Sequence, residues 1–183
     1  MIRISLTTRR AMRFGREGIQ GAQWYDALMD ILTARFGADA QMFAAFLAAT
    51  SPNTTVRGNV TLAKKAYMQY TANLPFVGYL PVVVANLERA ASGQKLSGIK
   101  VHHFHQAIVG DPDAVAVDRW MLRAYGVEKT TPARMKAIIV HVRASAKRLG
   151  MNPRELQAAI WTGIKGQVKQ SDSMAYWLNV ALS

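Results

Sequence analysis

The feature that most constrains the fold is a series of apolar segments at helical spacing, each closed by a start or stop signal. Between residues 24 and 36 apolar side chains recur every three or four residues, and Gly37 follows directly. Thr131-Pro132 and Asn152-Pro153 each place a capping side chain before a proline, which is typical of a helix start. We find no convincing strand pattern, so the sequence predicts an all-α protein.

The same signals predict the bounds of the helices and of the main loop. A Pro- and Gly-containing stretch over 71–81 predicts a loop. Helices are expected over 24–36, 41–49, 55–70, 82–91, 101–109, 119–125, 132–149, 153–165 and 173–182. Residues 1–19 carry many arginines, and they predict either a flexible basic arm or the first strand of a DNA-facing surface.

The composition of the chain narrows the kinds of molecule that it is expected to bind. The chain has 183 residues, half of them hydrophobic, which suits one compact unit or two tightly joined lobes. Its formal net charge of +12 favours a polyanionic partner, most simply nucleic acid, over a merely basic protein. No apolar run has the length of a membrane span and no signal-peptide core follows the N-terminus, so a cytoplasmic protein without membrane contact is expected. The absence of cysteine excludes thiolate catalysis and thiolate metal sites.

Two titratable residues stand at the starts of consecutive predicted helices. Lys100 falls in the first turn after Ser97-Gly98, and Asp118 directly precedes the helix that begins at Arg119. Burial frees a lysine amine for nucleophilic attack, and a nearby aspartate can accept a proton or stabilise positive charge on a sugar ring. Each residue also has an ordinary interpretation, since an aspartate before a helix is commonly its N-cap and a lysine near a turn is commonly solvated.

The histidines of the same stretch do not predict a metal site. His102 and His105 share a helix face, but His103 points elsewhere, and no carboxylate lies at a suitable spacing. Trp120, at the start of the following helix, is expected either to stack on an extruded base or to pack in the core.

The stretch from Leu96 to Gly126 resembles the helix-hairpin-helix DNA glycosylases, the endonuclease III-like superfamily. That family reads L-P-G-(V/I)-G-x-K-T-A, an apolar helix and then V-D-x-H-(V/I)-x-R, whereas this chain reads LSGIKV, an apolar helix and VDRWMLR. The interval from Lys100 to Asp118 is 18 residues (118 minus 100), as in endonuclease III. The upstream stretch FLAATSPNTTVRGNVTLAKKAY resembles the helix-turn-helix of the family, and the WY, AATSP and LQAAIW motifs are similar to small phage-encoded relatives.

Three departures qualify the resemblance. The hairpin is two residues short, because Gly98-Ile99-Lys100 replaces G-x-G-x-K, so its grip on a DNA phosphate is in question. Arg119-Trp120 replaces the usual histidine after the aspartate. The iron–sulfur cluster of many relatives cannot be built without cysteine.

The resemblance implies a single glycosylase-like unit over 1–183 with two helical lobes and a shortened helix-hairpin-helix. Lobe one would cover about 38–111, and lobe two about 1–37 plus 112–183. Lys100 would attack the sugar C1′ and Asp118 would stabilise the developing charge, with no metal or organic cofactor. The remaining implied site residues are Trp120, Thr50, Ser51 and Asn53 around the base, and Gly98, Arg57, Arg119 and Arg123 against DNA.

The expected function is therefore a DNA N-glycosylase, bifunctional with AP lyase activity, that excises a modified or hypermodified base from double-stranded DNA of phage type. One alternative keeps the fold but processes a hypermodified thymine without strand cleavage. A second alternative is a non-catalytic DNA-binding or inhibitory protein. The base and the oligomeric state are not readable from the sequence.

Overall fold

The computed structural model describes residues 7–166, and every regular element in that range is helical. Most bounds agree with the sequence-based expectation to within one residue, while the segment expected at 173–182 lies outside the described residues. The elements are α1 (Thr8–Glu17), α2 (Trp24–Phe36), α3 (Ala40–Thr50), α4 (Val56–Thr71), α5 (Pro81–Ala91), α6 (Ile99–Ile108), α7 (Arg119–Ala124), α8 (Pro132–Leu149) and α9 (Pro153–Lys165), with short 3₁₀ turns at Ile19–Gly21 and Gly37–Asp39. The all-α prediction is confirmed for these residues.

Local capping explains where the later helices begin and end. The hydroxyl of Thr131 accepts a hydrogen bond from the backbone N–H of Arg134 at the start of α8, and Gly150 ends that helix in the left-handed conformation with φ of 65°. At the start of α9, the carboxylate of Glu155 accepts from the backbone N–H of Asn152 at 3.0 Å.

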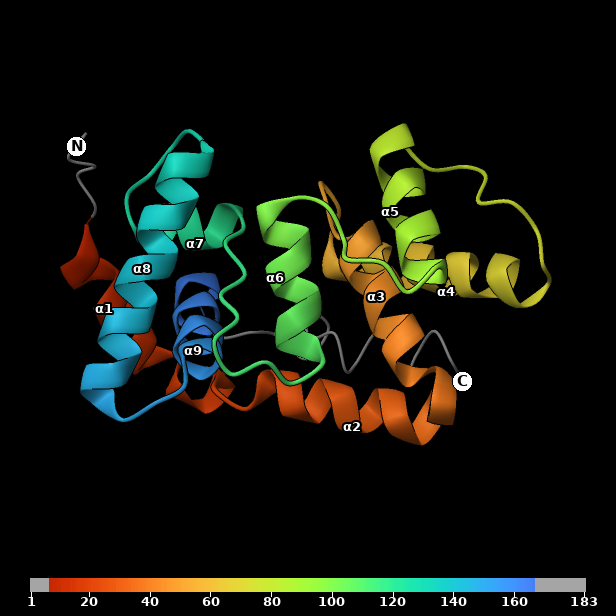
Figure 1. Ribbon diagram of the computed structural model, residues 1–183. Helices are drawn as coiled ribbons and strands as arrows, with labels where there is room; N and C mark the ends of the chain where they lie inside the picture. Colours follow the sequence, from red (N-terminus) through yellow and green to blue (C-terminus); the bar gives the residue numbers. More distant parts are fainter. Residues whose placement is uncertain (1–6, 167–183) are drawn as a thin grey trace.

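Two clusters of buried side chains form the interior. The first contains buried side chains of α2, α3, α4, α5 and α6, with α3 at its centre. The second contains buried side chains of α1, α7, α8 and α9. Figure 1 shows the corresponding arrangement: α1, α7, α8 and α9 lie at one end, α3, α4 and α5 lie at the other, α6 stands between them and α2 runs along the base. The clusters divide between Ala114 and Val115. The buried side chains of α2 belong to the first cluster, although residues 1–37 were expected in lobe two.

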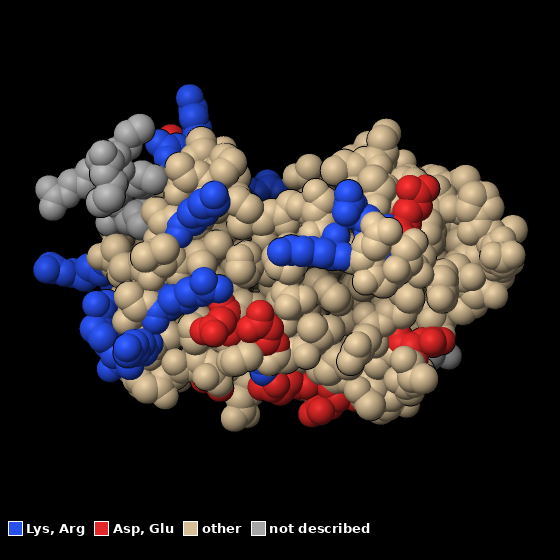
Figure 2. Space-filling view, viewed as in Figure 1, with Lys and Arg blue, Asp and Glu red and all other residues tan. Residues whose placement is uncertain are grey.

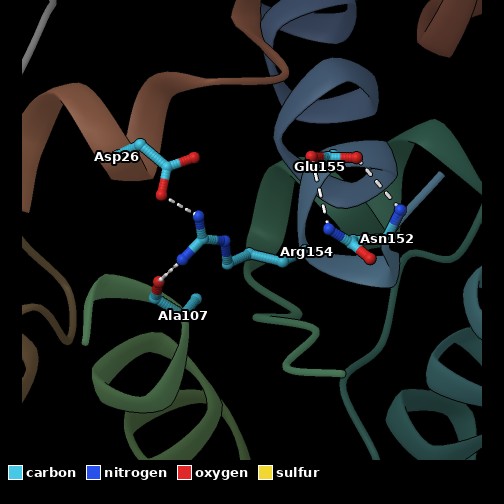
Figure 3. Close-up of polar contacts among 5 residues, drawn as sticks. All are labelled: Asp26, Ala107, Asn152, Arg154 and Glu155. Atoms are coloured by element: carbon cyan, nitrogen blue, oxygen red, sulfur yellow. Dashed lines mark hydrogen bonds and ion pairs between the residues drawn. The ribbon is translucent and has the colours of Figure 1, made fainter. Parts of the chain in front are cut away.

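Arg154 fastens these parts together. Its guanidinium, on α9, donates to the carbonyl oxygen of Ala107 on α6 at 3.2 Å and forms an ion pair with Asp26 on α2 (Figure 3). Its backbone N–H also donates to the carbonyl of Pro112 at 3.1 Å. The arginine side chain is 9% exposed, so one buried cation connects three segments that are far apart in the sequence.

The expectation of a basic arm or strand over residues 1–19 is wrong for the described part, because residues 8–17 form α1. Ala11 and Gly15 are buried, whereas the four arginines at 9, 10, 13 and 16 are exposed. The charges therefore mark the solvent face of an amphipathic helix. A Cβ on Gly18 would overlap the carbonyl oxygen of Ala159, and one on Gly163 would overlap that of Phe14, so glycines permit the close packing of this N-terminal segment on α9.

The surface is unevenly charged. Figure 2 shows Lys and Arg side chains gathered over the α1 and α8 end of the face in view, whereas the end formed by the α4–α5 loop carries few charged groups. That loop exposes Leu74, Val77 and Leu80, each by more than half. Its two aromatic residues, Phe76 and Tyr79, pack against the first cluster. Within residues 7–166, no helix has both the length and the apolar character needed to cross a membrane.

Candidate active site

Lys100 lies in the first turn of α6, and its amine is withdrawn from water. The Nζ atom donates to the carbonyl oxygen of Ser51 at 2.9 Å and to the hydroxyl of the same residue at 2.5 Å. Burial lowers the pKa of Lys100 to about 8, although the negative charge of Asp118 opposes the shift. Near that pH a large share of the amine is therefore neutral and able to act as a nucleophile.

Asp118 is the N-cap of α7, and three N–H groups fix its carboxylate. Its Oδ1 accepts from the backbone N–H groups of Trp120 and Met121, both at 2.9 Å. Its Oδ2 accepts from the indole N–H of Trp161 on α9, also at 2.9 Å. Sequence analysis offered a capping role and a chemical role as alternatives, but the geometry allows both, because capping uses only one of the two oxygens.

A single cavity of about 360 Å³ opens onto both residues. Lys100 and Asp118 form no direct ion pair, so their charged groups are separated within it. The first core cluster supplies the lysine side of the cavity and the second supplies the aspartate side. The wall also includes Trp24, Tyr25, Thr54, Thr55, Asn59, Phe104, Arg119, Trp120, Arg123, Gln157, Trp161 and Lys165. This volume lies at the lower end of the range of about 300–1,000 Å³ typical of small-molecule sites.

Flat aromatic rings and cations share one wall of the cavity. The ring of Trp120 lies 4.9 Å from the guanidinium carbon of Arg123 and 5.0 Å from the amine of Lys165. Trp161 and Trp24 lie side by side, with 6.3 Å between ring centroids. Rings held in this way are suited to stack on a planar ligand, and the cations beside them favour a ligand with negative charge.

The turn between α3 and α4 contributes one of its three expected residues. Ser51 lines the cavity and accepts from Lys100. Thr50 instead is buried as the last residue of α3, where its hydroxyl donates to the carbonyl of Phe46 at 2.8 Å. Asn53 is exposed in a left-handed conformation with φ of 55° and does not line the cavity. Thr50 and Asn53 therefore do not line the cavity, because the helix extends one residue further and the turn carries Asn53 outward, and a contact of either residue with a base stays a prediction.

The expected DNA contacts fall in two groups. Arg119 and Arg123 line the cavity, as do Lys100 and Trp120. Gly98 is exposed directly before α6, with φ of 93°, and Arg57 is exposed on α4, but neither lines the cavity. Contact of these residues with DNA stays a prediction.

The histidines of α6 do not converge. The ring Nδ1 of His103 accepts from the backbone N–H of Val115 at 3.4 Å, which ties it to the segment before α7. Among residues 7–166, no group of three or more His, Asp or Glu side chains has an arrangement that could hold a metal ion.

Sequence analysis did not single out three residues that line the cavity: Trp161, Gln157 and Tyr25. Trp161, named there only within the LQAAIW motif, donates its indole N–H to Oδ2 of Asp118. Gln157 stands one turn before it on α9, and its carboxamide oxygen accepts from the hydroxyl of Tyr25 at 2.6 Å. The sequence signal was the presence of a glutamine on the buried face of α9, which also carries the polar residues Arg154 and Thr162.

The fold and the site together define an all-helical protein in which a partly buried lysine and an aspartate that caps a helix face one cavity lined by aromatic rings. A family model described as "Family of unknown function (DUF7178)" matches residues 14–168, and the chain belongs to that family. The match includes both titratable residues and almost the whole described fold. No curated protein and no solved structure matches the chain.

Proposed function

We propose that this protein is a DNA N-glycosylase that releases a modified base through a Schiff base on Lys100 and then acts as an AP lyase. The observation that carries the proposal is the meeting of Lys100 and Asp118 in one cavity of about 360 Å³, with the pKa of the lysine lowered to about 8. A lysine with this lowered pKa is better suited to nucleophilic attack than to forming a salt bridge, and no carboxylate lies within contact distance of its amine.

The surroundings of the pair suit an extruded nucleotide. A base in a duplex must leave the helix before its glycosidic bond can be reached, and aromatic faces stabilise it outside the stack. Trp120 and Trp161 supply such faces, while Arg119 and Arg123 supply positive charge beside them. The division of the core into two clusters around the cavity supports a two-lobed, glycosylase-like arrangement, with the short turn before α6 in place of the full hairpin.

The reaction would proceed by displacement at C1′ of the sugar. The neutral amine of Lys100 forms a bond to C1′ as the bond between C1′ and the base nitrogen breaks, and its electron pair leaves with the base, which is protonated. The bonded amine gives up one proton, which balances the proton taken up by the departing base, and O4′ takes a proton from solvent as the bond between C1′ and O4′ breaks, which leaves a protonated Schiff base. Loss of a C2′ proton then eliminates the 3′ phosphate and cuts the strand.

Asp118 would act mainly through its charge. Positive charge develops on the sugar as the base departs, and a carboxylate fixed by three N–H groups faces the same cavity without having to reorganise. The Trp161 contact would hold the second carboxylate oxygen in place during this step.

Borohydride trapping tests the proposal. The protein is incubated with duplexes that carry damaged bases, hypermodified bases or an abasic site, with an unmodified duplex as the control, and borohydride reduces any Schiff base to a stable adduct. We expect an adduct that is lost in Lys100→Gln and retained in Lys95→Gln, an exposed lysine on the turn before the same helix.

The other outcomes separate the alternative functions. Base release without trapping would remove Lys100 as the nucleophile and favour a process without strand cleavage, such as work on a hypermodified thymine. DNA binding with neither base release nor trapping on any substrate would overturn the proposal in favour of a non-catalytic DNA-binding or inhibitory protein.

A further inference from the structure

A buried carboxamide faces the cavity with one end unused. Gln157 is 3% exposed, and its oxygen accepts a hydrogen bond from the hydroxyl of Tyr25 at 2.6 Å. Tyr25 is equally buried, and this burial raises the pKa of its phenol far above the ordinary value, so the hydroxyl keeps its proton and acts as the donor. The contact therefore fixes which end of the amide is turned away from Tyr25.

The amide nitrogen of Gln157 is the end of the side chain that does not bond to Tyr25. No acceptor for it occurs among residues 7–166, and the residue forms part of the cavity wall. Asn86, which does not line the cavity, uses both ends of its carboxamide: its nitrogen donates to the carbonyls of Val82 and Ser97, and its oxygen accepts from the N–H of Ser97. Asn59, in the cavity wall, resembles Gln157, because its oxygen accepts from the hydroxyl of Thr50 at 2.7 Å and its nitrogen has no acceptor among residues 7–166. The nitrogen of Gln157 is not fully enclosed, so it keeps access to the cavity, where a ligand can supply the acceptor that the described residues do not.

The chemistry of that ligand follows from the orientation. With its oxygen occupied by Tyr25, Gln157 offers N–H groups and no acceptor. A ring carbonyl satisfies such a donor, whereas an exocyclic amino group at the same position would place two donors against each other. The rings of Trp120 and Trp161 in the same wall favour a flat, unsaturated ligand.

We infer that Gln157, oriented by Tyr25, is a specificity-determining residue that selects a base with a ring carbonyl over the corresponding amino base. This inference rests on the proposed function, since it assumes that the cavity receives an extruded base. The substrate class is then a base that presents a ring carbonyl to Gln157, and the matching amino base, such as a cytosine type against a uracil type, is rejected.

A matched pair of ligands tests the inference through binding alone. Duplexes carrying 5-hydroxymethyluracil or 5-hydroxymethylcytosine differ at the discriminating position by a carbonyl oxygen against an amino group. Their affinities are measured by fluorescence anisotropy with the Lys100→Gln protein, so that no reaction consumes the DNA. We expect the keto duplex to bind about tenfold more tightly, since mispairing a buried donor typically costs that much.

Two variants show whether the preference comes from this pair. Gln157→Leu removes the donor, and Tyr25→Phe leaves the glutamine free to turn its oxygen toward the ligand. In each case we expect the two affinities to approach each other. Equal affinities in the parent protein, or a preference that survives both substitutions, would overturn the inference. Trapping of the wild-type protein on abasic DNA is read separately, so adduct formation without a keto preference would refute this inference and leave the proposed function standing.

Discussion

Replacing Lys100 by methionine should make the protein more stable at neutral pH. Methionine has nearly the same length as lysine and carries no charge into the cavity. The pKa of Lys100 is lowered from the ordinary 10.5 to about 8 because the ammonium loses hydration in the folded protein. The folded state therefore bears an unfavourable ionisation that the unfolded chain does not.

The pKa fixes the size and the pH window of the effect. Below pH 8 the lysine is charged in both states, and the full cost of about 3 kcal/mol is present, at about 1.4 kcal/mol for each tenfold change in proton affinity. Between pH 8 and 10.5 the folded protein loses its proton before the unfolded chain does, so the wild-type protein gains stability as the pH rises. Above 10.5 both states are neutral, and the ionisation cost disappears.

Urea unfolding of wild type and Lys100→Met at pH 7 and pH 10 measures this difference. We expect the advantage of the variant to shrink by about 2 to 3 kcal/mol over that interval. Lys95→Met is the matched control, because Lys95 is exposed, and its difference from wild type should change little with pH. A Lys100→Met variant that is less stable than wild type by the same amount at both pH values would refute the reasoning.

Three further predictions concern the reaction and the packing. The rate of borohydride-trapped adduct formation should rise as the pH increases through about 8 and then level, because the proposed nucleophile is the neutral amine of Lys100; a rate that stays flat between pH 6 and 9 would contradict this role. Trp161→Phe removes the N–H that donates to Asp118 at 2.9 Å, so single-turnover trapping should slow about tenfold while the circular dichroism spectrum is retained, and an unchanged rate would show that this contact does not matter. Gly163→Ala places a Cβ against the backbone of Phe14 and should lower the free energy of unfolding by about 2 kcal/mol or more. Gly150→Ala, strained only by its φ of 65°, should lower it by about 1 kcal/mol, and equal losses would argue against close packing of α1 on α9.

The helices were largely predictable from the sequence because their signals are local. Thr131-Pro132 and Asn152-Pro153 specify helix starts through contacts within one turn, and α8 and α9 begin as expected. The same locality made α1 hard to recognise. Its arginines suggested a tail, and the reason it folds is its close contact with α9 at Gly18 and Gly163, which joins residues about 150 positions apart.

The sequence predicted the two residues of the candidate site that have a reactive side chain and also stand at the start of a helix. Lys100 and Asp118 stood out because each occupies the start of a helix, and both face the cavity. Thr50 does not reach the cavity because α3 extends one residue further than expected, and Asn53 does not reach it because the turn after α3 carries it outward. Gln157 was visible in the sequence only as a polar residue on the buried face of α9, and its contacts and those of Trp161 depend on which side of α9 meets the boundary between the two clusters, which local sequence signals do not specify.

The candidate site is formed by two halves of the protein, and each half packs around its own hydrophobic cluster. Lys100 belongs to a helix of the first cluster, Asp118 follows the point at which the second begins, and Arg154 fastens the two on the side of α9 nearest α2 and α6. Neither half alone carries both charges, so the spacing between nucleophile and carboxylate depends on how the halves dock. A partner or substitution that loosened this docking would therefore separate the two groups and stop the proposed reaction while leaving the described helices intact. Far-ultraviolet spectra would not report such a loss, but hydrogen exchange at the junction near residue 114 would.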